Sequence, residues 1–282
     1  MARLHYSLKH WWMRELKEQE RFITDNNKSA VEKFKKKLKW QDDEKWFDCD
    51  GVGILFYAVV SDESHVVREL LQELKQKFKG VEYTRRLKSR IRDEGYIALG
   101  VPGGTTTLIA AMMTASLKVV SMLLEYGTNV ESVDVMGNDA FMYASAYGRP
   151  KNLQCWLQRV KDWDLNRQNT VVGGCALGQA VYMGASKLET VKVLLNAGAR
   201  LDFRTFAGGT VLTGAVENED SDPDVIRLIL EKLKSSSDSK TFTSLVNYQR
   251  KSTTFKWKSI YFVAKALYRT GVSESGLMAL LA

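Results

Sequence analysis

A sequence period of about 35 residues constrains this chain more than any other feature. Four segments with a shared pattern begin near residues 105, 138, 174 and 209. The apolar fourth position of each segment falls at Leu108, Phe141, Leu177 and Leu212, which are 33, 36 and 35 residues apart. A fixed period of this length is typical of solenoid proteins, in which each repeat packs only against its neighbours.

Each copy of the repeat contains two short helical patterns. The first is rich in small residues, as at Ala110–Ala111, and the second is more apolar, as in Val119–Leu124 and Val191–Leu195. Gly127 and Gly198 follow two of the second helices, and glycine readily adopts the left-handed conformation that ends a helix. The pattern therefore predicts stacked helix-turn-helix units.

These features resemble ankyrin repeats, in which a β-turn and Thr-Pro-Leu-His precede an Ala-rich helix, and a Val-Val-x-Leu-Leu-Leu helix leads into Gly-Ala-Asp. Leu123–Gly127 and Leu194–Ala199 match this pattern closely. The resemblance implies an all-α ankyrin-repeat solenoid of helix-turn-helix units with β-turn tips and an N-terminal helical cap. It also implies a non-catalytic scaffold that binds a protein partner. The alternative is another two-helix solenoid whose glycines coincide by chance.

The sequence departs from the ankyrin pattern, because no copy retains the Thr-Pro-Leu-His tetrad. The hydrogen bonds that the tetrad makes between repeats must therefore be replaced by packing or lost. In the fourth copy a longer loop precedes the second helix, which we expect to begin with Asp222 as N-cap and Pro223 as its first residue. The histidine position of the tetrad holds Phe56, Ile109, Met142, Gly178 and Thr213.

Three regions are expected along the chain. Residues 1–47 form a basic amphipathic helical region or cap, and residues 48–233 form the ankyrin-repeat array. A basic insertion at residues 75–94 is expected to extend a second helix and then form a loop. Residues 234–282 form a divergent C-terminal repeat or cap, and the apolar end Leu280–Ala282 also favours a truncated repeat, since terminal repeats usually expose a polar face.

The net charge of +8 lies in three segments rather than in the body of the array. Residues 1–47, 75–94 and 234–282 carry +4, +5 and +6, whereas residues 48–74 carry −5 and residues 95–233 carry −2. This distribution argues against a uniformly basic nucleic-acid-binding domain.

The N-terminal region allows two interpretations. Leu8, Trp12, Leu16 and Ile23 share one helical face among basic residues. Such a helix can lie on an anionic membrane surface or act as a calmodulin-type target. It can also cap the open end of the first repeat, which a solenoid requires, and we favour the cap. An acidic partner or an anionic membrane surface is the alternative for the two basic segments, 1–47 and 75–94.

Little in the sequence points to catalysis. The three Cys and three His residues lack the spacing of a metal site or a nucleophile pair, so we expect no catalytic residue, metal, cofactor or small-molecule substrate. The Gly100–Thr107 loop lacks the Gly-Lys-Ser/Thr ending of a P-loop, and we interpret it as a turn with Thr105 or Thr106 near a helix N-cap. The acidic loop Glu217–Asp224 is interpreted as a solvated surface. The absence of a signal peptide or apolar span predicts a cytoplasmic location.

We predict that a partner binds at the turn tips and on the first helices. Aromatic, Met and Arg side chains at exposed positions are typical of interface anchors. The alternative is that several of these side chains pack between repeats. The predicted partner-binding residues are Met136, Asn138, Tyr143, Tyr147, Arg167, Asn169, Gln179, Tyr182, Met183, Phe203, Arg204 and Phe206.

Two other functions remain open. The chain could be the regulatory or targeting module of a larger multidomain enzyme or channel that continues past Ala282. It could also associate with a membrane surface or a nucleic acid through its basic flanks.

Overall fold

The computed structural model describes residues 29–38, 53–87, 102–183, 188–217, 222–236 and 238–246. The chain divides into two compact units. Unit 1 comprises Met1–Phe141 with Gln158–Val160, and unit 2 comprises Met142–Leu157 with Lys161–Ala282. The described residues are mainly helical, and isolated β-bridges close two of their loops.

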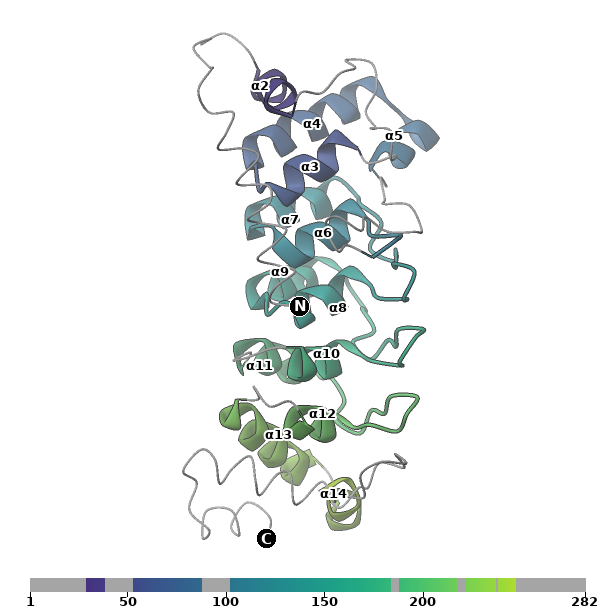
Figure 1. The fold of residues 1–282 in the computed structure, drawn as a ribbon, viewed down its shortest axis with the longest axis vertical. Coiled ribbons are helices and arrows are strands. Elements are labelled where there is room, and N and C mark those ends of the chain that lie inside the picture. Colours follow the sequence, from purple (N-terminus) through teal and green to yellow (C-terminus); the bar gives the residue numbers. More distant parts are fainter. Residues whose placement is uncertain are drawn as a thin grey trace. The chain divides into compact units, whose positions relative to one another are not determined.

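In unit 1, two helix pairs stack on each other. The first pair is α3 (Ile54–Val60) and α4 (Ser64–Lys77), and the second is α6 (Thr107–Thr114) and α7 (Leu117–Glu125), as Figure 1 shows. First helix packs against first helix, α3 on α6, and second against second, α4 on α7. This arrangement follows from the repeat, because equivalent residues meet at each junction.

Unit 2 repeats the arrangement with α10 (Ala176–Tyr182), α11 (Leu188–Asn196), α12 (Val211–Glu217) and α13 (Pro223–Ser236). Here α10 packs against α12, and α11 packs against α13. A further helix, α14 (Ser239–Val246), contacts α13. This helix lies in the region, residues 234–282, for which the sequence predicts a divergent repeat or cap, and residues 247–282 lie outside the described residues.

Some of the first helices are buried around nearly their whole circumference, whereas α10 exposes Tyr182. In α6, every residue from Thr107 to Met113 is buried. The same is true throughout α8 (Ala140–Ala146), which precedes α9 (Pro150–Arg159). A helix that is apolar on all sides is stable only inside a packed layer. The second helices are amphipathic instead: α7 buries Val119, Val120, Met122 and Leu123 and exposes its other face.

Local sequence signals set the helix ends as predicted. Gly127 and Gly198 have φ of +78° and +96°. After α11, the amide of Gly198 donates to Leu195 and that of Ala199 donates to Leu194, which is a Schellman motif. Helix α13 begins at Pro223, and the Thr106 hydroxyl accepts a hydrogen bond from the Ile109 amide at the start of α6.

Two kinds of contact occupy the positions of the missing tetrad. Before α12, Thr210 and Thr213 cap each other: the Thr210 amide donates to Oγ1 of Thr213 at 2.7 Å, and the Thr213 amide donates to Oγ1 of Thr210 at 3.1 Å. The histidine positions of earlier copies hold apolar side chains, and Phe56, Ile109 and Met142 are buried there. Local hydrogen bonds and packing therefore replace the tetrad.

Helix α2 (Ala30–Lys37) packs against α4 through its buried residues Val31 and Phe34. The Glu69 carboxylate on α4 accepts hydrogen bonds from the first two amides of α2, those of Ala30 at 3.3 Å and Val31 at 3.1 Å. A carboxylate at a helix N-terminus is favourable because the amide dipoles point toward it. The rest of the predicted N-terminal region, residues 1–28 and 39–47, lies outside the described residues.

The basic insertion forms more helix than the sequence predicted. Helix α4 extends to Lys77, and residues Gly80–Leu87 form α5, where a loop was expected. Helix α5 contacts α4, and a 2.6 Å ion pair one turn apart, between Arg86 and Glu82, supports it. Residues 88–94 lie outside the described residues.

In the described part of the chain, no helix has the length and apolar character needed to cross a bilayer.

Replacing glycine with alanine should have opposite effects at Gly198 and Gly214. At Gly198 the left-handed backbone penalises a Cβ, so Gly198→Ala should lower the free energy of unfolding by about 1 kcal/mol. Gly214 lies inside α12, where alanine is more favourable than glycine, and a Cβ there would lie at an ordinary contact distance of 3.6 Å from Val181. Gly214→Ala should therefore raise the free energy of unfolding by about 0.5–1 kcal/mol. Urea denaturation followed by circular dichroism measures both, and shifts of the same sign would contradict this assignment of the helix end.

Removing the Glu69 carboxylate should release α2 from α4. We expect Glu69→Ala to increase tryptic cleavage within Lys33–Lys37 severalfold, because the two amides at the start of α2 lose their acceptor. Site-resolved mass spectrometry of the digest measures the rate. Arg68→Ala, at the exposed neighbouring position, is the control. Equal cleavage in the two variants would show that Glu69 does not hold α2 in place.

Candidate functional site

Three of the loops that precede a first helix, those before α8, α10 and α12, each form a tight hairpin. One backbone hydrogen bond closes it: Asp134 to Asn138, Asn169 to Gly174, and Thr205 to Gly209, with N···O distances of 2.9–3.0 Å. A glycine with positive φ completes each turn. These glycines are Gly137, Gly173 and Gly208.

A polar side chain at the start of each hairpin accepts hydrogen bonds from amides of the loop. The Asp134 carboxylate accepts from Met136 and Asn138 at 2.9 and 2.8 Å. The Asn169 carbonyl oxygen accepts from Val172 and Gly174 at 3.1 and 3.2 Å. Since tight turns leave amides without backbone partners, these oxygens stabilise the hairpin conformation. Thr205 does the same for the amide of Gly209 at 2.9 Å.

In unit 2 the hairpins before α10 and α12 are joined to each other. The Phe206 amide donates to the Val172 carbonyl at 3.0 Å, and the Gln168 side-chain amide donates to the carbonyls of both Gly173 and Arg204. The Phe206 ring lies so close to Gly173 that a Cβ there would fall 2.6 Å from the ring. In Figure 1 the two loops extend to the same side of α10 and α12.

The same connection occurs in unit 1. The Val135 amide donates to the Gly103 carbonyl at 3.0 Å, and Gly104 approaches the backbone of Asp134 closely. The Thr105 hydroxyl donates to the Pro102 carbonyl at 2.7 Å, and that of Thr106 caps α6. The Gly/Thr-rich loop is therefore the turn ahead of the helix, as predicted.

Exposed apolar side chains gather on these hairpins. In unit 2, Val171, Val172 and Phe206 are 59%, 53% and 65% exposed, and we call these three residues the hairpin patch. In unit 1, Val133 and Val135 are exposed on the corresponding hairpin. Because the hairpins are linked by hydrogen bonds, the patch is held in one arrangement without a partner.

Charged residues precede both hairpins of the patch in the sequence. The Arg167 guanidinium lies over the Trp163 ring, 4.6 Å from its centroid. Arg200 donates two hydrogen bonds to Asp202, at 3.0 and 2.8 Å, and this contact holds the pKa of the Asp202 carboxyl below its usual value. Arg204, which is exposed, lowers the same pKa further through its positive charge.

The structure divides the twelve predicted partner-binding residues into three groups. Tyr182, Arg204 and Phe206 are exposed. Met136, Tyr147, Arg167, Gln179, Met183 and Phe203 are half-buried. Asn138, Tyr143 and Asn169 are buried, which corrects the assumption that they lie on the surface.

The three buried residues have roles within the fold. Asn169 caps its own hairpin, and the side-chain amide of Asn138 lies 3.4 Å from the Asp134 carboxylate. Tyr143 belongs to α8 and is only 2% exposed, and its ring lies 6.3 Å from that of Tyr147. The spacing of four residues correctly predicted that the two tyrosines lie next to each other. The Tyr143 side chain is nevertheless buried, whereas that of Tyr147 is half-buried. Burial also raises the pKa of Tyr147.

Sequence reasoning missed Val171 and Val172. The available signal was loop length: four positions separate Asn169 from Gly173, whereas three separate Asp134 from Gly137 and Thr205 from Gly208. The additional residue extends the loop, and both valines in it are exposed.

Among the described residues, no group of three or more His, Cys, Asp and Glu side chains could hold a metal ion. Cys155 and Cys175 are buried free thiols, and burial raises the pKa of Cys175. A raised thiol pKa lowers the fraction of reactive thiolate at neutral pH. Cys49 lies outside the described residues.

Replacing Asn169 should destabilise the hairpin before α10. Asn169→Ala leaves two amides without their acceptor, and we expect it to lower the free energy of unfolding by about 1–3 kcal/mol. Asn169→Asp keeps an acceptor oxygen and should retain most of the stability, as Asp134 does in unit 1. Thermal and urea unfolding measure both variants, and equal losses would show that the acceptor oxygen is not the stabilising group.

Comparisons with known proteins agree with this architecture. No family model matches the chain. The crystal structure of EF0377, an ankyrin repeat protein, matches with a TM-score of 0.55 and 23% sequence identity, over 82% of this chain and 96% of that one. The chain is also 30% identical over 134 residues to the phosphocholine transferase AnkX of Legionella pneumophila subsp. pneumophila. That match covers 47% of this chain but only 13% of the relative.

Proposed function

We propose that this chain, which has an ankyrin-repeat fold, is a non-catalytic scaffold that binds a protein partner through its hairpins and first-helix face. The observation that carries the proposal is the hairpin patch. Its three apolar side chains are exposed on loops that hydrogen bonds already hold in place. A preordered surface loses less conformational entropy on binding than a flexible one.

The composition of the surface supports a protein partner. Aromatic and Arg side chains are enriched at protein interfaces, where apolar centres are surrounded by polar groups. Phe206 supplies the aromatic group, and Arg167 and Arg204 supply charged groups on the same two hairpins. Tyr182, exposed on α10, extends the surface onto the first helix that follows the earlier hairpin. We include the half-buried predicted residues as its margin.

Asn138, Tyr143 and Asn169 are left out of the proposed surface, because the fold uses them internally. The other functions considered from the sequence stay predictions. These are a regulatory module of a longer protein, and membrane or nucleic-acid association through the basic flanks.

Replacing the central apolar side chains should weaken partner binding without unfolding the chain. We expect Phe206→Ser and Val172→Ser each to raise the Kd by about fivefold or more, as for residues at the centre of an interface. The partner is first identified by affinity capture and mass spectrometry on the full chain. The Kd is then measured with the purified partner by calorimetry.

Leu117→Ser is the matched control, because Leu117 is an exposed apolar residue on α7 and is not part of a hairpin. Thermal unfolding checks that each variant is folded. Parental affinity in the two hairpin variants, or an equal loss in the control, would refute this surface as the binding site.

A further inference from the structure

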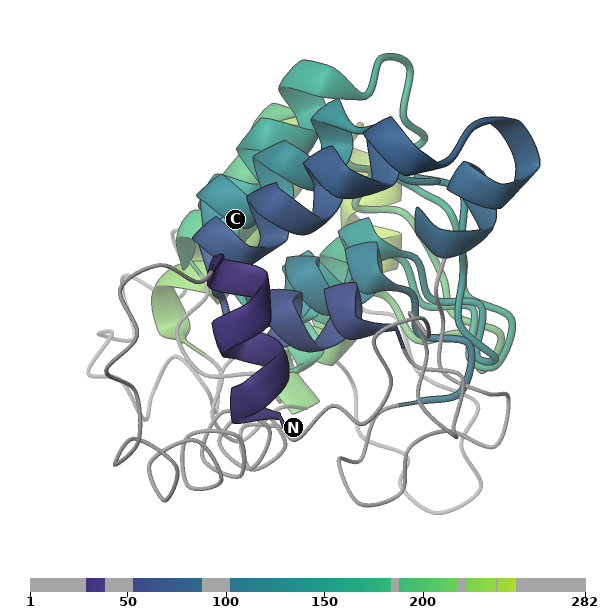
Figure 2. The same ribbon diagram turned by 90° about the horizontal axis from the view of Figure 1, so that it is seen from above.

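A basic arm extends from the second helix of the first pair in unit 1. Helix α4 has 14 residues, whereas α7 has 9, and α5 follows it after two connecting residues. We define the basic arm as residues 75–87, which contain five basic residues and a single acidic one, Glu82. Figure 2 shows α5 beyond the far end of α4.

Contacts with α7 hold the arm in place. The Tyr83 hydroxyl donates to the Tyr126 carbonyl at 2.7 Å, next to the C-terminal end of α7. The Lys75 ammonium lies 5.7 Å from the centroid of the Tyr126 ring. Burial raises the pKa of Tyr83, so its hydroxyl keeps the proton that it donates. The arm is therefore an ordered part of unit 1.

The acidic groups on and beside the arm are already paired. Glu82 forms a 2.6 Å ion pair with Arg86, whose guanidinium also lies 4.1 Å from the centroid of the Phe78 ring. Glu73 forms a 2.6 Å ion pair with Lys77. These two acidic groups offset the charges of Lys77 and Arg86, and residues 73–87, with five basic and two acidic residues, keep a net charge of +3.

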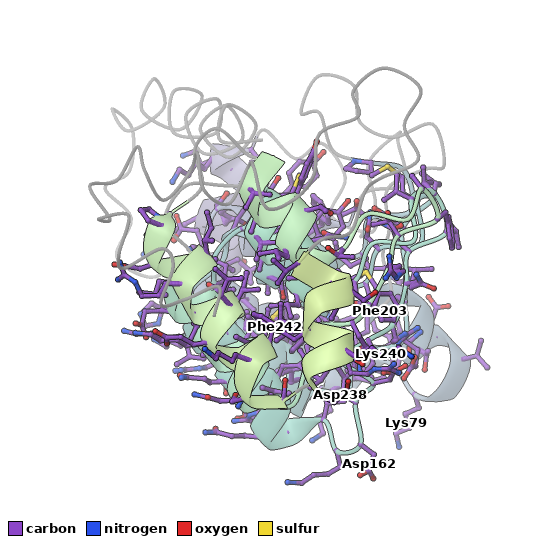
Figure 3. All side chains as sticks on the ribbon, turned by 90° about the horizontal axis from the view of Figure 1, so that it is seen from below. Lys79, Asp162, Phe203, Asp238, Lys240 and Phe242 are labelled. Atoms are coloured by element: carbon purple, nitrogen blue, oxygen red, sulfur yellow. The ribbon has the colours of Figure 1, made fainter. Side chains whose placement is uncertain are left out.

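Two of the lysines that carry this excess, Lys75 and Lys79, are exposed. Lys77 is exposed as well, and its ion pair with Glu73 lies at the surface. Figure 3 shows Lys79 at the outer edge of the ribbon. Exposed lysines attract negative charge over about one Debye length, roughly 8 Å at physiological salt.

We propose that the basic arm is a docking surface for an acidic segment of a protein partner. Lys75, Lys77 and Lys79 supply the complementary charge, and the contacts of Tyr83 and Arg86 hold α5, which follows these lysines. Complementary charge speeds association and selects the partner, and lysine ammonium groups pair with carboxylates without a fixed fork geometry. This function goes beyond the hairpin surface and uses a different part of the chain.

The side chains of the arm fit a protein carboxylate cluster better than a membrane or a nucleic acid. Membrane-surface helices bury Trp, Phe and Leu in the lipid, whereas the aromatic groups of the arm, Phe78 and Tyr83, are half-buried against the protein. Val81 is its one exposed large apolar residue among those described. Phosphate recognition favours arginine forks, and Arg86 is already bound to Glu82 and covered by Phe78.

The test measures binding of a fluorescein-labelled octaglutamate peptide to the full chain by fluorescence anisotropy. We expect the parent to bind at low salt and to lose affinity toward about 0.15 M salt. The triple variant Lys75→Gln, Lys77→Gln, Lys79→Gln should raise the Kd by about tenfold or more. The control variant Lys151→Gln, Lys232→Gln, Lys234→Gln changes the net charge equally at three exposed lysines elsewhere, and should change the Kd by less than about twofold.

Circular dichroism and thermal unfolding confirm that both variants are folded, and phosphatidylserine vesicles and a DNA duplex serve as competing ligands. Three results would overturn the proposal: no binding of the peptide by the parent, equal losses in both triple variants, or tighter arm-dependent binding of the vesicles or the duplex than of the peptide. Phe206→Ser should bind octaglutamate like the parent, so failure of the hairpin surface and failure of the arm are separate outcomes.

Discussion

The rest of the structure depends on the burial of the first helices. Helices α6 and α8 have no polar face, so they are stable only when neighbouring elements cover them on every side. In unit 1 this cover includes α3 and α7, and in unit 2 α10 is covered by α11 and α12. Because the stability of such an array is a sum over neighbours, loops outside the helical layers can vary without loss of the fold.

The hairpins are loops outside the helical layers. A tight hairpin must satisfy its own amides, and Asp134, Asn169 and Thr205 turn their oxygens inward to do so. The apolar residues of the same loops, such as Val172 and Phe206, are left exposed. The usual distribution of polar and apolar side chains is thus inverted locally, and a rigid apolar surface results. The basic arm adds a charged surface, anchored to α7 by Tyr83.

Short-range signals predicted much of the fold. The helix pairs, the helix ends at Gly127 and Gly198, the start at Pro223 and the cap at Thr106 were all predicted correctly. Each depends on residues within a few positions of one another, so the local sequence determines it. The candidate surface was predicted less well. Asn169 was assigned to this surface because it is a polar residue in a turn. Its side-chain oxygen instead accepts hydrogen bonds from amides of the same turn.

The sequence by itself determined the repeat, its helical pairs and the turns between them, because backbone preferences and apolar periodicity act over one or two helical turns. Only the tertiary structure decided which side chains face outward. The amide of exposed Phe206 donates a hydrogen bond to Val172, 34 residues earlier, and Tyr83 on α5 donates one to Tyr126, 43 residues later. Such contacts leave no local pattern, because each is made between loops or helices that meet only after the repeats have stacked.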